Sequence, residues 1–212
     1  TVFTGASFTS VRAIGMTGGT DPAKVPTLPT NWELVSGFLL GPTVDLNSAD
    51  LTGIDLTSAN LTDAILTDAI LTETTVNSVN LTGATLSGVT TGGLVGTPAA
   101  LPTDWQLTNG YLIGPEANLT NADLSDQNLD GAMLQSANLS YAYLQGASLR
   151  GVDLTGINGN NATFLTADLT NARLTYASLN GASLSRAILA GVSSGSISGT
   201  PANLPSSWHL VN

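Results

Sequence analysis

The chain has 212 residues, and only 9% of them are charged, against about 25% in an average globular protein. The net charge is −10, and the chain has only five lysines and arginines. These are too few for the basic cluster that phosphate binding requires, so the sequence predicts no nucleic-acid binding. The absence of cysteine excludes disulfides, zinc fingers and thiolate catalysis, and no apolar run approaches the roughly 18 residues of a membrane-spanning helix.

The sequence predicts one continuous repeat array over 1–212, divided into six stretches. A short stub at 1–13 carries Phe3 and Phe8, five residues apart. Regular arrays follow at 44–90 and 117–192, and the remaining stretches at 14–43, 91–116 and 193–212 each hold one tryptophan. The chain starts at Thr1 without a visible signal peptide, which favours a processed form or a fragment of a longer array.

An apolar residue returns at every fifth position of both arrays. Between Leu46 and Leu86, and again between Leu119 and Leu189, 21 of the 24 central positions are leucine. The residue two places before the centre is alanine at 17 of these 24 positions. This period fits neither an α-helix nor a flat strand, and low-complexity disorder would not preserve it.

The repeat predicts a coil with one pentapeptide on each side. The central leucine and the preceding alanine would face inward, and successive coils would stack by backbone hydrogen bonds at roughly 4.8 Å. Because one coil cannot close its own core, stacking must supply the stability. The predicted core residues include Leu51, Leu61, Leu81, Leu124, Leu139, Leu149, Leu169 and Leu179.

The motif Ala49-Asp50-Leu51-Thr52-Gly53, and its many copies, resembles the pentapeptide repeat family. This resemblance implies an all-β fold, a right-handed four-sided β-solenoid with about 20 residues per coil. Residues 20 apart, such as Asp153 and Arg173, would then stack as neighbours on one side. The family is functionally diverse, so the resemblance does not identify a function.

The tryptophan segments share a second motif that predicts inserted β-hairpin-like elements. Trp105 and Leu107 are followed by a short turn at Asn109-Gly110 and by the apolar run 111–113, which ends at Gly114-Pro115. The last copy stops at Asn212, which favours either a longer parent protein or a second chain that completes the hairpin. Similar segments are interspersed in some long bacterial members of the family.

Two interpretations of these segments stay open. The tryptophans pack against the solenoid as a brace, or they project an aromatic surface for a partner. In the second case the candidate interaction residues are Trp32, Trp105, Trp208, Tyr111 and Phe38.

The sequence shows no catalytic, cofactor-binding or metal-binding constellation, so we expect no enzyme and no cofactor. His209 is the only histidine, and acids such as Asp45, Asp50 and Asp55 recur at a spacing that sends them to different sides of the coil. Gly159 occupies a leucine position, which predicts a local void, bulge or bend.

These features favour a non-enzymatic structural or protein-interaction scaffold. Its partner would be another protein or a second copy, associated end to end or as a dimer. The alternative is an acidic DNA mimic that binds DNA gyrase or a related topoisomerase, as the resemblance allows. The lack of cysteine with abundant threonine, asparagine and glycine favours an extracytoplasmic location over a cytoplasmic one.

Overall fold

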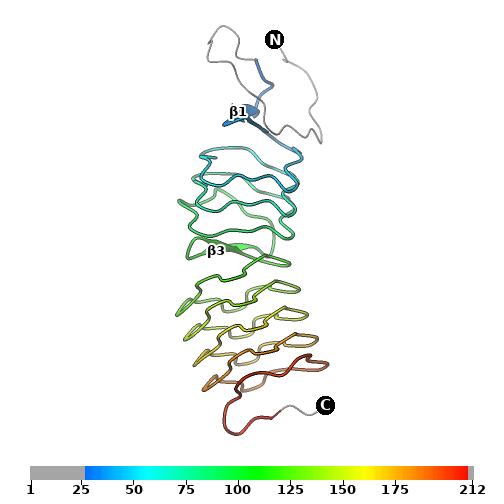
Figure 1. Ribbon diagram of the computed structural model, residues 1–212. Helices are drawn as coiled ribbons and strands as arrows, with labels where there is room; N and C mark the ends of the chain where they lie inside the picture. Colours follow the sequence, from blue (N-terminus) through cyan, green and yellow to red (C-terminus); the bar gives the residue numbers. More distant parts are fainter. Residues whose placement is uncertain (1–26, 210–212) are drawn as a thin grey trace. The chain divides into compact units, whose positions relative to one another are not determined.

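A computed structural model describes residues 27–209, and the predicted stub at 1–13 lies outside them. The chain forms two compact units, unit 1 (Thr1–Thr103) and unit 2 (Asp104–Asn212), each of which is described by itself (Figure 1). Between residues 27 and 209 the structure has short strands and isolated bridges, and no helix there could cross a membrane.

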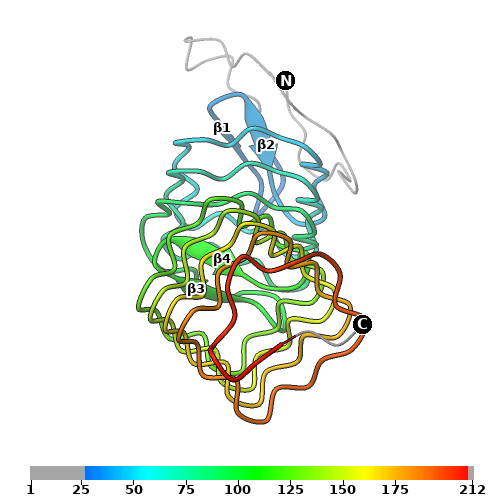
Figure 2. The same cartoon turned by 60° about the horizontal axis from the view of Figure 1, so that its bottom comes forward.

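The described part of each unit opens with a two-stranded antiparallel hairpin. In unit 1, β1 (Glu33–Val35) pairs with β2 (Phe38–Leu40), and in unit 2, β3 (Gln106–Thr108) pairs with β4 (Tyr111–Ile113) (Figure 2). Both two-residue turns have positive φ throughout, at 49° and 88° for Ser36-Gly37 and at 48° and 75° for Asn109-Gly110. This backbone twist matches the twist of the flanking strands, which is why Asn-Gly and Ser-Gly suit these turns.

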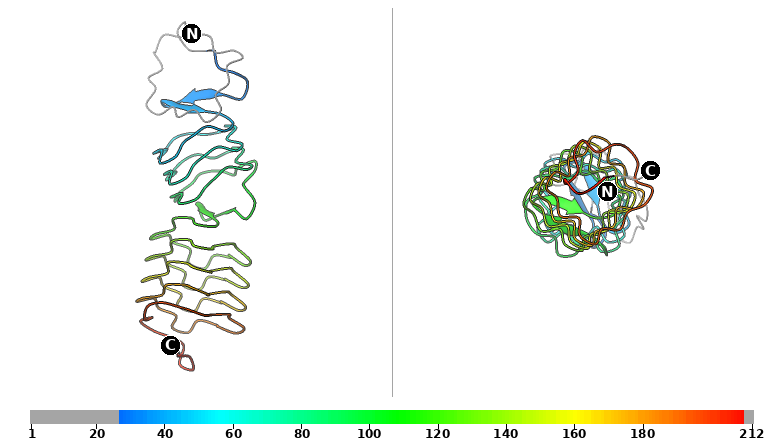
Figure 3. Two further views of the ribbon diagram at one scale, coloured as in Figure 1. Left: turned by 90° about the vertical axis from the view of Figure 1, so that its right-hand side faces the viewer. Right: turned by 90° about the horizontal axis from the view of Figure 1, so that it is seen from below.

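After its hairpin, each unit continues as a stack of coils (Figure 3). Parallel bridges join residues 20 apart, as in Asp45 with Ile65 and Asn118 with Asn138, and four such bridges complete one coil. The Leu51 N–H donates to the Ile70 carbonyl at 2.8 Å, and the same bond recurs along both arrays. The five-residue repeat therefore builds a four-sided coil whose backbone groups are satisfied by the next coil.

The core of each unit is the column of central leucines and inward alanines. The eight leucines predicted for the core are each at most 2% exposed. Burial of each leucine contributes roughly 1.5–3 kcal/mol, so the stack is held mainly by this column.

Gly159 does not interrupt the stack, so the predicted void, bulge or bend is wrong. The Gly159 N–H donates to the Ser178 carbonyl at 2.8 Å, as a leucine at this position would. A Cβ at Gly159 would lie 3.3 Å from Cδ1 of Ile157 and 3.0 Å from Cδ2 of Leu179. The side chain of Leu179 and the larger Ile157, which stands at an alanine position, thus fill the space that the glycine leaves.

The boundary between the units falls within the segment expected at 91–116. Val95 pairs with Thr75 and Ala100 with Asn80, so the first part of this segment closes the last coil of unit 1. Trp105 and the hairpin that follows it belong to unit 2. Residues 96–103 are therefore a closing segment and 104–116 an opening segment, although they form one sequence motif. Residues 199–206 close unit 2 in the same way, with Asn203 paired to Ser183.

Candidate interaction surfaces

Two of the three tryptophans pack onto a glycine of their own hairpin. The indole of Trp32 lies over Gly41, and the indole of Trp105 lies over Gly114, so closely that a Cβ at either glycine would collide with the ring. Trp105 and Tyr111 also pack against the hydrophobic core of unit 2. In unit 2 the aromatic residues Trp105 and Tyr111 therefore attach the hairpin to the array.

The candidate residue Phe38 is buried in β2, with 9% of its surface exposed. Trp208 differs from the other four candidates because it is 44% exposed. Of the five candidates, Trp208 is the one that is exposed, so it offers the most surface to a partner.

The hairpin of unit 2 is tied to the first coil by two polar contacts at Asp123. The Asn109 side-chain amide donates from Nδ2 to the Asp123 carbonyl at 2.9 Å. The Asp123 N–H donates to the Tyr111 hydroxyl oxygen at 3.3 Å. In unit 1 the corresponding hairpin instead brings Glu33 near Asp55, and burial together with the Asp55 charge raises the pKa of Glu33.

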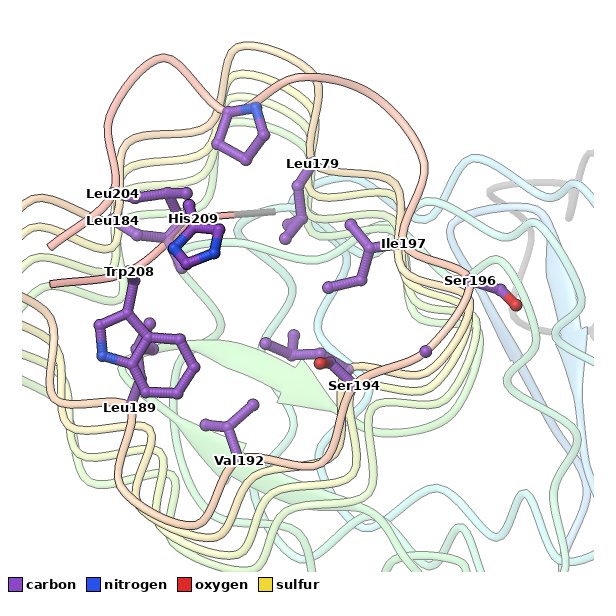
Figure 4. A pocket seen from close by; sticks show the side chains of 13 residues that line it. Leu179, Leu184, Leu189, Val192, Ser194, Ser196, Ile197, Leu204, Trp208 and His209 are labelled. Atoms are coloured by element: carbon purple, nitrogen blue, oxygen red, sulfur yellow. The ribbon is translucent and has the colours of Figure 1, made fainter. Parts of the chain in front are cut away.

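An apolar cavity of about 510 Å³ opens at the last coil of unit 2 (Figure 4). We call it the C-terminal opening. Leu179, Val192 and Ile197 point into it, and Trp208 and His209 lie across its mouth. Leu174, Leu184, Leu189 and Leu204 complete its apolar lining. No aspartate, glutamate, lysine or arginine contributes to the described wall of the cavity.

The acidic side chains before the central leucines are engaged in their own turns. Asp50 Oδ1 accepts hydrogen bonds from the Thr52 N–H at 3.1 Å and the Thr52 hydroxyl at 2.6 Å. The same arrangement recurs at Asp55, Asp123 and Asp168. These bonds lower the pKa of each carboxyl group. The carboxylates therefore stay ionised and stabilise turns, which does not suit general-acid chemistry.

Both arginines with an ion pair in the described chain lie on unit 2. Arg150 Nε donates to Asp168 Oδ2 at 2.6 Å, and Arg173 Nη1 lies 3.9 Å from Asp153 Oδ2. Burial raises the pKa of Asp153, but the hydrogen bonds from Thr155, the Arg173 charge and the Gln135 amide together lower it. The residues are partners from neighbouring coils, as the 20-residue spacing predicts for Asp153 and Arg173.

Metal binding has no support among residues 27–209, where no group of three histidine or acidic side chains is placed to hold an ion. The sequence did not predict the role of Val192, Ile197 and Leu204 in the C-terminal opening, nor the contact that Asn109 makes. Val192, Ile197 and Leu204 follow the last central leucine, where the periodic signal stops, whereas the lining residues Leu174, Leu179, Leu184 and Leu189 are central leucines of the repeat. Asn109 was predicted only as a turn residue.

Comparison with known proteins decides the family. The family model for pentapeptide repeats matches eight copies, over residues 44–89, 117–156 and 157–193, which is more than half of the chain. The chain belongs to the pentapeptide repeat family. This family has the right-handed β-solenoid fold, which agrees with the 20-residue stacking of both units. No curated protein matches the chain.

Solved structures of pentapeptide repeat proteins are similar to parts of this chain. Rfr23 from the cyanobacterium Cyanothece 51142 is 23% identical, with 71% of this chain and 91% of that chain covered and a TM-score of 0.40. A pentapeptide repeat protein from Nostoc PCC 7120 is 33% identical over 45% of this chain and 77% of its own, with a TM-score of 0.24. QnrB1, a plasmid-mediated fluoroquinolone resistance protein, is 14% identical over 68% and 65%, with a TM-score of 0.40. Similarity this low carries no information on what this chain binds.

Proposed function

We propose that this pentapeptide repeat protein is a non-enzymatic protein-interaction scaffold that self-associates through the C-terminal opening. The observation that carries the proposal is an open apolar cavity with a tryptophan 44% exposed at its mouth. Exposed apolar surface costs about 25 cal/mol per Å², and such surfaces commonly mark binding sites. The engagement of the carboxylates in turns supports the absence of enzymatic chemistry.

The proposed occupant of the opening is the same surface of a second copy. The chain carries a net charge of −10, so two copies repel each other over most of their surface. The described wall of the opening holds no acidic or basic residue except His209, so the electrostatic repulsion between two copies is smallest when they meet there. A twofold arrangement would place two apolar cavities face to face, with each copy contributing the same residues.

Sedimentation velocity over a range of concentrations tests this proposal. We expect the wild-type chain to form dimers that high salt strengthens, because screening weakens the repulsion between the acidic surfaces. Ile197→Asp should abolish the dimer. Ile188→Asp is the matched control, because Ile188 is 50% exposed and lies outside the cavity lining. A monomer at every concentration, or equal effects of the two substitutions, would contradict self-association at this site.

A second candidate function, mimicry of DNA toward a topoisomerase, draws on the charge of unit 1. Residues 27–103 hold seven acids and no base, namely Glu33, Asp45, Asp50, Asp55, Asp63, Asp68 and Glu73. The stacked columns weaken this candidate, since Asp45 is followed by Ile65, Asp50 by Ile70 and Asp55 by Thr75. Carboxylates therefore do not follow one another from coil to coil as phosphates do along DNA. Salt-sensitive inhibition of gyrase in a supercoiling assay would favour it over the first proposal.

A further inference from the structure

Three Asn-Gly pairs occur in the sequence, at Asn109-Gly110, Asn158-Gly159 and Asn180-Gly181. An Asn-Gly pair can deamidate without an enzyme. The backbone nitrogen of the glycine attacks Cγ of the asparagine, the side-chain amide leaves as ammonia, and a succinimide ring forms. Water then opens the ring to give aspartate or isoaspartate. Glycine favours the first step because its backbone is flexible and it has no side chain in the way.

The coil protects two of these pairs. The Gly159 N–H donates to the Ser178 carbonyl at 2.8 Å, and the Gly181 N–H donates to the Thr200 carbonyl at 2.8 Å. Both bonds belong to the ladder between coils. The glycine nitrogen can attack only after such a bond has opened, so reaction at Asn158 and Asn180 requires local unfolding of the coil.

The third pair lies outside the ladder. Asn109 and Gly110 form the turn between β3 and β4, and the Asn109 side chain is exposed. Within residues 27–209, the Gly110 N–H donates no backbone hydrogen bond. The Asn109 side-chain amide donates to the Asp123 carbonyl at 2.9 Å. The attacking nitrogen at this pair is therefore available in the folded chain.

We propose that Asn109 is a site of spontaneous deamidation and that its modification releases the hairpin of unit 2 from the first coil. The product carries a carboxylate where Nδ2 was, so the donor to the Asp123 carbonyl is lost and two oxygens face each other. Isoaspartate also lengthens the backbone by one atom, which breaks the pairing of Thr108 with Tyr111. Release of the hairpin would expose Leu112 and Ile113, which are at most 1% exposed when it is docked.

Peptide mapping by mass spectrometry tests the site. The full chain is incubated in near-neutral buffer at physiological temperature, with a parallel sample in urea as the unfolded reference. In the folded sample we expect the amide-to-acid mass change at Asn109 well before it occurs at Asn158 or Asn180, and in urea at all three. Equal reaction at the three sites in the folded chain, or reaction at Asn109 only in urea, would overturn the assignment.

Hydrogen exchange tests the structural consequence. The isoaspartate form, separated by ion exchange, should exchange the amides of 106–113 and Asp123 faster than the unmodified chain does. The amides of the coils near Leu149 and Leu169 are the internal control and should be unchanged. Unchanged exchange in the hairpin of the modified chain would show that deamidation does not release it.

Discussion

The indole ring of Trp105 lies directly over Gly114, which is nine residues later in the chain and directly follows β4. The same relationship joins Trp32 to Gly41 in unit 1. Each tryptophan packs where its glycine has no side chain, so the Trp and Gly of the recurring motif are one packing unit. This relationship explains why a glycine stands nine residues after the tryptophan in both units.

The first prediction concerns this packing. Gly114→Ala should destabilise unit 2 by about 1–3 kcal/mol, because the new methyl group must displace a ring packed against the core. Gly195→Ala is the matched control in the same unit, since a Cβ there meets no atom within 4 Å. Urea unfolding followed by tryptophan fluorescence measures both. Equal stability of the two variants would mean that the ring moves aside at little cost.

The glycine of the closing segment of unit 2 gives the second prediction. Gly199 has a φ of 81°, and a Cβ there would lie 2.6 Å from the backbone nitrogen of Asn180. Gly131 has a φ of 70°, but a Cβ there meets no atom within 4 Å. Gly131→Ala should therefore cost only the strain of the left-handed backbone, about 1–2 kcal/mol, and Gly199→Ala should cost clearly more. Thermal unfolding of the two variants separates collision from strain, and a smaller loss for Gly199→Ala would refute the contact.

The third prediction tests whether the large side chain of Ile157 compensates for the missing side chain at Gly159. Gly159→Leu alone should destabilise the coil by about 1–3 kcal/mol through overpacking, and Ile157→Ala alone by about 2–5 kcal/mol through a cavity. The double variant restores the Ala and Leu of an ordinary pentapeptide, so it should be much more stable than the sum of the two losses suggests. A double-mutant cycle by chemical denaturation measures this coupling. Additive losses would show that the two positions do not share one space.

The fourth prediction is a pH dependence that Asp168 causes. Hydrogen bonds from Thr170, and then Arg150, lower its pKa in the folded chain. An unfolded aspartate has a pKa of about 3.9, so this group stabilises the fold above that pH, and the contribution is lost as the pH falls through the lower folded pKa. Asp168→Asn should weaken the fold at neutral pH, and the difference from wild type should shrink in acid.

A converse variant provides the control for this pH effect. Asn138 accepts the same two bonds from Ser140, at 3.1 Å from the backbone and 2.7 Å from the hydroxyl. Asn138→Asp should therefore add an acid-sensitive contribution of the same sign. Urea midpoints from neutral pH down to acid measure both variants. A constant difference between wild type and Asp168→Asn at every pH would contradict the assignment.

The fold was predictable because one position in five is nearly invariant in its chemistry. A leucine at each centre, with an alanine two residues before it, predicts the inward pair, and the family resemblance adds the four sides. The role of the polar positions was not predicted. Asp50 and Thr52 form a hydrogen-bonded turn, which becomes visible only when the backbone between them is known.

The candidate site was harder to predict from the sequence than the fold. The three tryptophans share one motif, yet Trp105 is packed on Gly114, whereas Trp208 lies at an open cavity. The difference depends on which segments surround each ring, and no local pattern carries that information. The effect of Gly159 was predicted wrongly for a related reason, since Ile157 compensates for it through space.

The number of pentapeptides in a unit also sets the direction in which its chain leaves. Counted from the hairpin, the array of unit 2 contains six more pentapeptides than that of unit 1. Six sides correspond to one and a half coils, so the two closing segments depart on opposite sides relative to their own hairpins. In unit 1 the closing residue Ala100 stacks in the column of Asn60, whereas its counterpart Asn203 stacks in the column of Asp123. Gain or loss of single repeats would therefore rotate the exit by a quarter turn while the core stays the same.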